Sequence, residues 1–221
     1  MMDRNPSGKY IVLGVCAGIG FFGANSFAET PHAHPKLFLP PAASQSIESK
    51  ANDIVLMDLD VVDQDGTALR FKSDVIGDRL VVMDFVYTTC TTACPIQTAI
   101  FSQLQEKLGD RLGQEVFLVS VSVDPTTDIP PRLKAYANKH HARPGWKWIT
   151  GKKSNVDQVL LALRAYSSDL DEHPSMILIG DGQVGGWTRY YGFPKLDTLM
   201  KQIDALQAQK NALSLSNSGT K

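Results

Sequence analysis

The stretch LVVMDFVYTTCTTACPI, residues 80–96, combines a continuous apolar run with a turn that contains two cysteines. The run Leu80–Tyr87 has the length of a strand, and such continuity is typical of a strand buried on both faces. Cys90 and Cys94 follow in small polar surroundings, and Pro95 begins a helical pattern. Because the free N–H groups of a helix N-terminus carry partial positive charge, thiolates are stabilised there. The stretch therefore predicts a strand–turn–helix unit that presents two reactive thiols.

The rest of the chain alternates between strand and helix patterns around this unit. A hairpin is predicted from residues 54–62 and 68–71, joined at the turn 63–66. Further strands are expected at 116–123, 146–150, 176–179 and 187–191, and helices at 96–108, 133–140, 154–166 and 196–206. This order predicts an α/β fold with a central mixed sheet flanked by helices and an N-terminal β-hairpin extension. A thiol pair at the first strand-to-helix turn of such a fold resembles the arrangement in thioredoxin.

Composition limits the class of protein. The 221 residues include 43% hydrophobic and 20% charged residues, as in a globular protein, and the net charge is −1. A nucleic-acid partner is not expected, because that would require a clear basic excess.

The N-terminus has the pattern of a targeting segment. Residues 1–28 are expected to be a signal peptide cleaved after Ala28, or a membrane anchor, since residues 10–27 are nearly continuously apolar. We therefore expect a periplasmic or other extracytoplasmic location. A flexible proline-rich arm is predicted at 29–50, the main domain at 51–210 and a polar tail at 211–221.

The cysteine pair can form a disulfide or bind a metal. Cys16 belongs to the predicted leader, so only Cys90 and Cys94 remain, which is too few for a disulfide scaffold. They are four residues apart, one helical turn, so both sulfurs can face one side. Two thiolates suit Cu(I) or Zn(II), but a structural zinc site needs four ligands, whereas Cu(I) accepts two or three.

His173 is the histidine expected to face the thiols. His32 and His34 lie in the predicted arm, and His140 and His141 end a polar helix. His173 precedes the strand 176–179, and in a thioredoxin-like fold the loop before that strand lies against the cysteine turn. We therefore expect it to be the third member of the site.

Three motifs resemble those of the SCO/SenC family, the copper-binding, thioredoxin-like proteins of cytochrome oxidase assembly. They are the Cys-x-x-x-Cys-Pro motif at 90–95, the segment SVSVDPTTDIPP at 120–131, and His173 ahead of the closing hairpin. The resemblance covers residues 54–193. Thr91-Thr92 departs from the Pro-Asp of the best-known members, and Pro174 stands where Ser or Thr is common. Pro174 also resembles the cis-proline that thioredoxins place opposite their dithiol.

The resemblance implies copper, as Cu(I) or also Cu(II), bound by Cys90, Cys94 and His173. It implies a metallochaperone that delivers copper to the Cu(A) site of cytochrome c oxidase, or that maintains the thiols of that site. The implied partners are the oxidase subunit that carries Cu(A), periplasmic copper chaperones and thiol-disulfide reductants.

Other functions remain open. The main alternative is a periplasmic thiol-disulfide oxidoreductase with Cys90 and Cys94 as catalytic residues and His173 tuning the thiolate. A peroxidase and a purely structural disulfide have less support, since a disulfide across so short a loop constrains the unfolded chain little. Asp124 and Asp128 are interpreted as strand-end and helix-cap acids. Asp84, a carboxylate inside an apolar strand, is a candidate for tuning the thiols, because burying an unpaired charge is costly.

Overall fold

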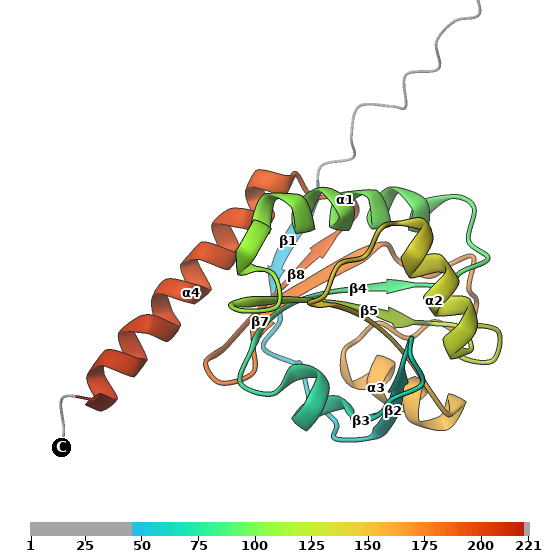
Figure 1. Cartoon of the computed structure of the whole chain (residues 1–221), viewed down its shortest axis with the longest axis horizontal. Helices are drawn as coiled ribbons and strands as arrows, with labels where there is room; N and C mark the ends of the chain where they lie inside the picture. Colours follow the sequence, from blue (N-terminus) through green and yellow to red (C-terminus); the bar gives the residue numbers. More distant parts are fainter. Residues whose placement is uncertain (1–45, 219–221) are drawn as a thin grey trace, which may run out of the picture. The chain divides into compact units, whose positions relative to one another are not determined.

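The computed structural model describes residues 46–218, and these form an eight-stranded mixed sheet in the order β1-β8-β7-β4-β5-β6-β2-β3 (Figure 1). Strands β4, β5 and β6 are parallel, and the other neighbouring strands run antiparallel. The strands are β1 (Ile47–Lys50), β2 (Asp60–Asp63), β3 (Ala68–Arg70), β4 (Leu80–Val86), β5 (Val116–Ser122), β6 (Trp146–Thr150), β7 (Met176–Asp181) and β8 (Gly185–Tyr191).

Helices cover both faces of the sheet. The four α-helices are α1 (Ala93–Leu108), α2 (Pro130–Lys139), α3 (Lys153–Ala162) and α4 (Leu196–Ser218). Helices α1, α2 and α4 contribute to the core cluster on one face, and α3 and a short π-helix, Phe71–Ile76, to the cluster on the other. A 3-10 turn, Gly109–Arg111, follows α1. The predicted mixed sheet flanked by helices is confirmed.

Strand β4 lies at the centre of the sheet between β7 and β5, and all seven of its residues are buried. Leu80, Val82 and Val86 belong to the core cluster beneath α1, whereas its other apolar side chains join the opposite cluster. This two-sided burial explains the continuous apolar run, because neither face of the strand meets solvent. It also fixes the place where the cysteine turn leaves the sheet.

The hairpin extension is present as β2 and β3, although β2 begins only at Asp60. Two other predicted boundaries differ. Residues 47–50, expected in the flexible arm, form the edge strand β1, because their backbone pairs with β8. Residues 211–218, expected in the polar tail, continue α4, since no proline or glycine interrupts the helix before Gly219.

The predicted leader, with its apolar residues 10–27, and most of the predicted arm lie outside the described residues. Within residues 46–218, no helix is both long enough and apolar enough to cross a membrane.

Candidate metal and thiol site

The two cysteines lie where the chain passes from β4 into α1. β4 ends at Val86, and Cys94 is the second residue of α1. Both cysteines are free and buried, with exposed fractions of 8% for Cys90 and 5% for Cys94. The Cys94 backbone N–H donates to Cys90 Sγ at 3.4 Å. Because Thr92, the residue before the helix, makes no side-chain cap, the Cys90 sulfur takes the place of the usual oxygen acceptor at this helix N-terminus.

The same contacts make the two thiols unequal. Burial opposes ionisation of Cys90, but hydrogen bonds from Cys94 and Thr92 outweigh it and lower the pKa of Cys90 to about 7. Burial raises the pKa of Cys94 to about 12, and the neighbouring Cys90 and Asp84 add to the effect. At neutral pH a large share of Cys90 is therefore thiolate whereas Cys94 is a thiol, as expected for a nucleophile and its buried partner.

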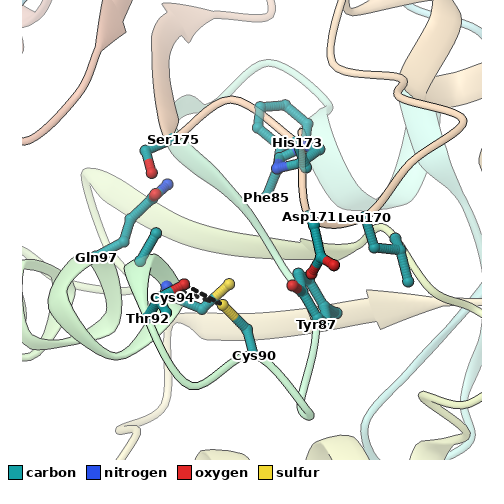
Figure 2. Close-up of a pocket in the computed structure, with 11 residues that line it drawn as sticks. Phe85, Tyr87, Cys90, Thr92, Cys94, Gln97, Leu170, Asp171, His173 and Ser175 are labelled. Atoms are coloured by element: carbon teal, nitrogen blue, oxygen red, sulfur yellow. Dashed lines mark hydrogen bonds between the residues drawn. The ribbon is translucent and has the colours of Figure 1, made fainter.

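His173 lines the same pocket as the two cysteines, as the sequence predicted. Figure 2 shows the two sulfur atoms on one wall and His173 on the opposite wall, in the loop that leads into β7. Its Nε2 lies 3.1 Å from the carbonyl oxygen of Ala165. A carbonyl can only accept, so Nε2 carries the proton. Burial lowers the pKa of His173, which favours the neutral ring with its lone pair on Nδ1.

The pocket is small, about 30 Å³, which is enough for one ion or water. Among residues 46–218, however, no three His, Cys, Asp or Glu side chains converge closely enough to hold a metal ion. Thiols and imidazole thus share the pocket without surrounding a common point. Its lining consists of Phe85, Tyr87, Cys90, Thr92, Ala93, Cys94, Gln97, Leu170, Asp171, His173 and Ser175.

Tyr87 belongs to this pocket and to a larger cleft of about 550 Å³ that opens beside Cys90 between the cysteine turn and residues 168–171. Burial and the nearby Cys90 sulfur raise the pKa of Tyr87 to about 12, so its hydroxyl stays protonated. The thiolate can thus be approached from this outer cleft.

The other predicted candidates do not meet the thiols. His140 caps the C-terminus of α2 and packs against Tyr136 with tilted rings, their centroids 4.6 Å apart, and His141 follows it at the surface. His32 and His34 lie outside the described residues. The structure contains no cis peptide bond in its described part, so the expected likeness of Pro174 to a cis-proline is wrong.

Two buried carboxylates lie near the cysteine turn. Asp84 is fully buried on β4, and neither of its oxygens makes a hydrogen bond of normal geometry in the described structure. Burial raises its pKa to about 7, against a smaller opposing effect of the Ser120 hydroxyl in the paired position of β5. The interpretation of Asp128 as a helix-cap acid is wrong, because the cap position of α2 is Ile129. It is instead a fully buried side chain that accepts hydrogen bonds from Thr88 and Ser122. Burial raises the pKa of Asp128, as it does that of Asp84, but here the hydrogen bonds from Thr88 and Ser122 act against the rise.

The chain matches the family model described as SCO1/SenC over residues 48–187, well over half of its length. It is 32% identical over 127 residues to the SCO1 protein homolog of Bacillus subtilis, covering 57% of this chain and 64% of that protein.

Solved structures agree in fold. One is BsSco, described as a member of the Sco family of cytochrome c oxidase assembly proteins with a disulfide switch, at a TM-score of 0.61 and 23% identity over 73% of this chain and 98% of that one. Another is copper-bound ScoI of Bradyrhizobium japonicum, at a TM-score of 0.56 and 21% identity, covering 66% and 96% of the two chains. The thioredoxin-like fold is confirmed, and by its match to the family model the chain belongs to the SCO1/SenC family.

Proposed function

We propose that this protein is a copper-binding metallochaperone that holds the ion with Cys90, Cys94 and His173. The observation that carries the proposal is the meeting of two free thiols and one neutral imidazole in a single small pocket. Two sulfurs and one nitrogen form a soft donor set, and soft donors select Cu(I). Copper bound to structural relatives such as ScoI supports the same assignment.

The hydrogen bond at one ring nitrogen of His173 leaves the other ring nitrogen suited to bind a metal ion. Metal-ligating histidines usually donate the N–H of the other ring nitrogen to a carbonyl or carboxylate, which fixes the tautomer. The contact between His173 Nε2 and the Ala165 carbonyl is of this kind and leaves Nδ1 as the donor atom. Because the three side chains do not yet converge, we expect the loop that carries His173 to move toward the sulfurs on loading.

Copper and a disulfide are alternative states of the same two sulfurs. Cu(I) requires both cysteines reduced, and a Cys90–Cys94 disulfide removes both thiolate ligands. The thiol asymmetry also shapes loading, since Cys94 must give up its proton when a metal takes its sulfur.

The decisive experiment is an anaerobic Cu(I) titration of the reduced protein against a chromogenic chelator. Cys90→Ser and Cys94→Ser should each abolish stoichiometric binding, and His173→Ala should weaken binding by about ten-fold or more. His140→Ala is the matched control, because His140 packs against Tyr136 and does not line the pocket. Full-affinity binding by the double cysteine variant would overturn the proposal.

The proposed destination is the Cu(A) site of cytochrome c oxidase, with the subunit that carries this site as the main partner. The description of BsSco as a member of a family of oxidase assembly proteins supports this assignment. Periplasmic copper chaperones and thiol-disulfide reductants are the proposed suppliers of copper and electrons. We propose an extracytoplasmic location, with residues 1–28 as signal peptide or residues 10–27 as anchor to the inner membrane.

A second function, thiol-disulfide exchange, is favoured by the difference between the thiol pKa values of about 7 and about 12. The Cys90 thiolate would attack a partner disulfide and release one partner thiolate. Cys94, after losing its proton, would then attack the Cys90 sulfur, which leaves a Cys90–Cys94 disulfide and a reduced partner. Cys94→Ser should trap the mixed disulfide with a model disulfide peptide, and failure of the reduced protein to react would exclude this activity.

A further inference from the structure

We propose that Asp128 is a positioning residue for the thiol site: its buried carboxylate holds the turn that presents Cys90. Asp128 lies 38 residues after Cys90 in the sequence, in the loop between β5 and α2. It touches neither sulfur and acts through Thr88, two residues before the cysteine.

Asp128 accepts hydrogen bonds from both the backbone and the side chain of Thr88. The Thr88 N–H donates to both carboxylate oxygens of Asp128 at 3.2 Å, and the Thr88 hydroxyl donates to Oδ1 at 2.6 Å. The Ser122 hydroxyl donates to Oδ2 at 2.7 Å. Ser122 Oγ in turn accepts from the Asp124 N–H at 3.1 Å, which directs its proton toward Asp128. All the donors thus converge on one acceptor, and an ionised carboxylate is the side chain that can accept them all.

Thr88 has a defined place in the turn. The Cys90 N–H donates to the Tyr87 carbonyl at 3.2 Å, so Thr88 and Thr89 are the two central residues of a tight turn that ends at Cys90. The preceding backbone is held by the Val123 N–H, which donates to the Val86 carbonyl at 2.9 Å. Asp128 therefore fixes the first central residue of the turn, and with it the direction in which Cys90 leaves the sheet.

This placement matters because the Cys90 sulfur must reach the first turn of α1. Its contact with the Cys94 N–H at 3.4 Å is one of those that stabilise the thiolate, and it depends on the path of residues 88–90. Without the carboxylate, the Thr88 N–H and hydroxyl lose their acceptor, and the turn can take other conformations. Residues that orient the ligands of a metal site typically change affinity by 10–100-fold when replaced.

If Asp128 only stabilised the fold, its replacement would lower stability without changing the thiols. The chain contains a second buried carboxylate that serves as a control for this case. Asp63 is also buried, with 3% exposure, and accepts from the N–H groups of Asp65 and Thr67 and from Lys147. It braces the β2–β3 turn and lines neither pocket beside Cys90. Asp63→Asn should therefore reduce stability without changing the thiols.

The test compares Asp128→Asn, Thr88→Val, Thr88→Ser and Asp63→Asn in the full chain. Two site properties are measured: Cu(I) affinity by chelator competition, and the dithiol–disulfide equilibrium constant against glutathione. Asp128→Asn and Thr88→Val should weaken Cu(I) binding by about ten-fold or more and shift the dithiol–disulfide constant. Thr88→Ser, which keeps the hydroxyl, should restore both properties, and Asp63→Asn should leave both at wild-type values.

The Cu(I) measurement rests on the proposed function, whereas the dithiol–disulfide measurement does not, so the two can fail separately. If the wild type binds no Cu(I) but Asp128→Asn shifts the dithiol–disulfide constant, the copper assignment fails and the positioning role stands. If Asp128→Asn and Thr88→Val lower stability as Asp63→Asn does, yet keep both site properties of the wild type, the positioning role is overturned. Should Asp128→Asn fail to fold, the comparison of Thr88→Val with Thr88→Ser tests the positioning role, and wild-type values of both site properties in Thr88→Val would overturn it.

Discussion

Two buried regions near the cysteine turn differ in whether their polar groups are hydrogen-bonded. The first, which we call the anchor, consists of Asp128, Thr88 and Ser122, and its carboxylate receives a hydrogen bond at both oxygens. The second, the floor, consists of Asp84, Thr98, Tyr136 and Trp148 in the core on the α1 and α2 side of the sheet. In the described structure, both Asp84 oxygens, the Thr98 and Tyr136 hydroxyls and the Trp148 indole N–H make no hydrogen bond of normal geometry. The Ser120 hydroxyl near Asp84 and the Thr98 hydroxyl near Tyr136 only weaken the rise in pKa that burial causes.

The two regions act on the site in different ways: the anchor sets the backbone geometry of the cysteine turn, and the floor affects the charge of a buried acid. Hydrogen bonds in the anchor fix a backbone conformation, whereas unpaired groups in the floor fix nothing. A buried carboxylate without partners instead costs free energy when it is ionised, so it favours the protonated form and responds to pH. The site thus has one carboxylate suited to holding the thiols in place and another whose ionisation is coupled electrostatically to Cys94.

The largest expected effect is that of Asp84→Asn on stability. The pKa of Asp84 is about 7 in the folded state and near its usual 3.8 when unfolded. A raised folded pKa adds stability that is fully present below the unfolded pKa and is lost as pH rises through the folded pKa. Removing the charge should therefore stabilise the protein at pH 8 by about 2–4 kcal/mol and have little effect near pH 4. Urea unfolding of both proteins between pH 4 and pH 8 measures this.

Asp63→Asn provides a control of opposite sign. Although burial alone would raise it, the pKa of Asp63 is held below its usual value by Thr67, Lys147 and Asp65. Its stabilisation is therefore present above the unfolded pKa and lost as pH falls, so Asp63→Asn should destabilise the protein at pH 8. If Asp84→Asn also destabilises it there, Asp84 has a partner and the contrast between floor and anchor disappears.

The floor and the anchor differ in how far the sequence could predict them. The cysteine turn is encoded locally, by a continuous apolar run, two spaced thiols and a proline, and the order of strands was enough to bring His173 to the same pocket. Asp84 stood out because a charge interrupts an apolar strand. Whether it has a partner, however, depends on the placement of Ser120 on the neighbouring strand in three dimensions.

The anchor left no local signal. Asp128 is followed by Ile-Pro-Pro, a pattern that indicates a helix start, and its contact with Thr88 spans forty positions. β1 was missed for a similar reason, since a four-residue edge strand gains its structure from pairing with β8 rather than from its own pattern. The end of α4 is different: the apolar periodicity fades after Leu206, but nothing in the sequence ends the helix before Gly219.

An intermediate effect is expected from Ser122→Ala, which removes one donor from the anchor. The hydroxyl donates to a buried carboxylate, and hydrogen bonds to charged groups contribute more than neutral ones, so the loss should be about 2 kcal/mol. Ser102→Ala is the matched control. Its hydroxyl donates only to the Thr98 carbonyl within α1, and alanine favours the helix, so its change should stay within about 0.5 kcal/mol. Equal losses in the two variants at pH 8 would mean that the Asp128 carboxylate is not charged there.

The smallest effect is expected from Thr98→Val in the floor. Thr98 is fully buried on α1 one helical turn after Cys94, and its hydroxyl lies near that of Tyr136 without making a hydrogen bond of normal geometry in the described structure. Valine has nearly the same shape, so the change removes an unpaired polar group without leaving a cavity. Because burying an unsatisfied hydroxyl is itself unfavourable, stability should change by less than about 0.5 kcal/mol or rise slightly. A loss above about 1.5 kcal/mol in urea unfolding would mean that the hydroxyl is paired after all. The floor would then contain a satisfied hydroxyl as the anchor does, and the lack of hydrogen-bond partners would no longer distinguish the two regions as a whole.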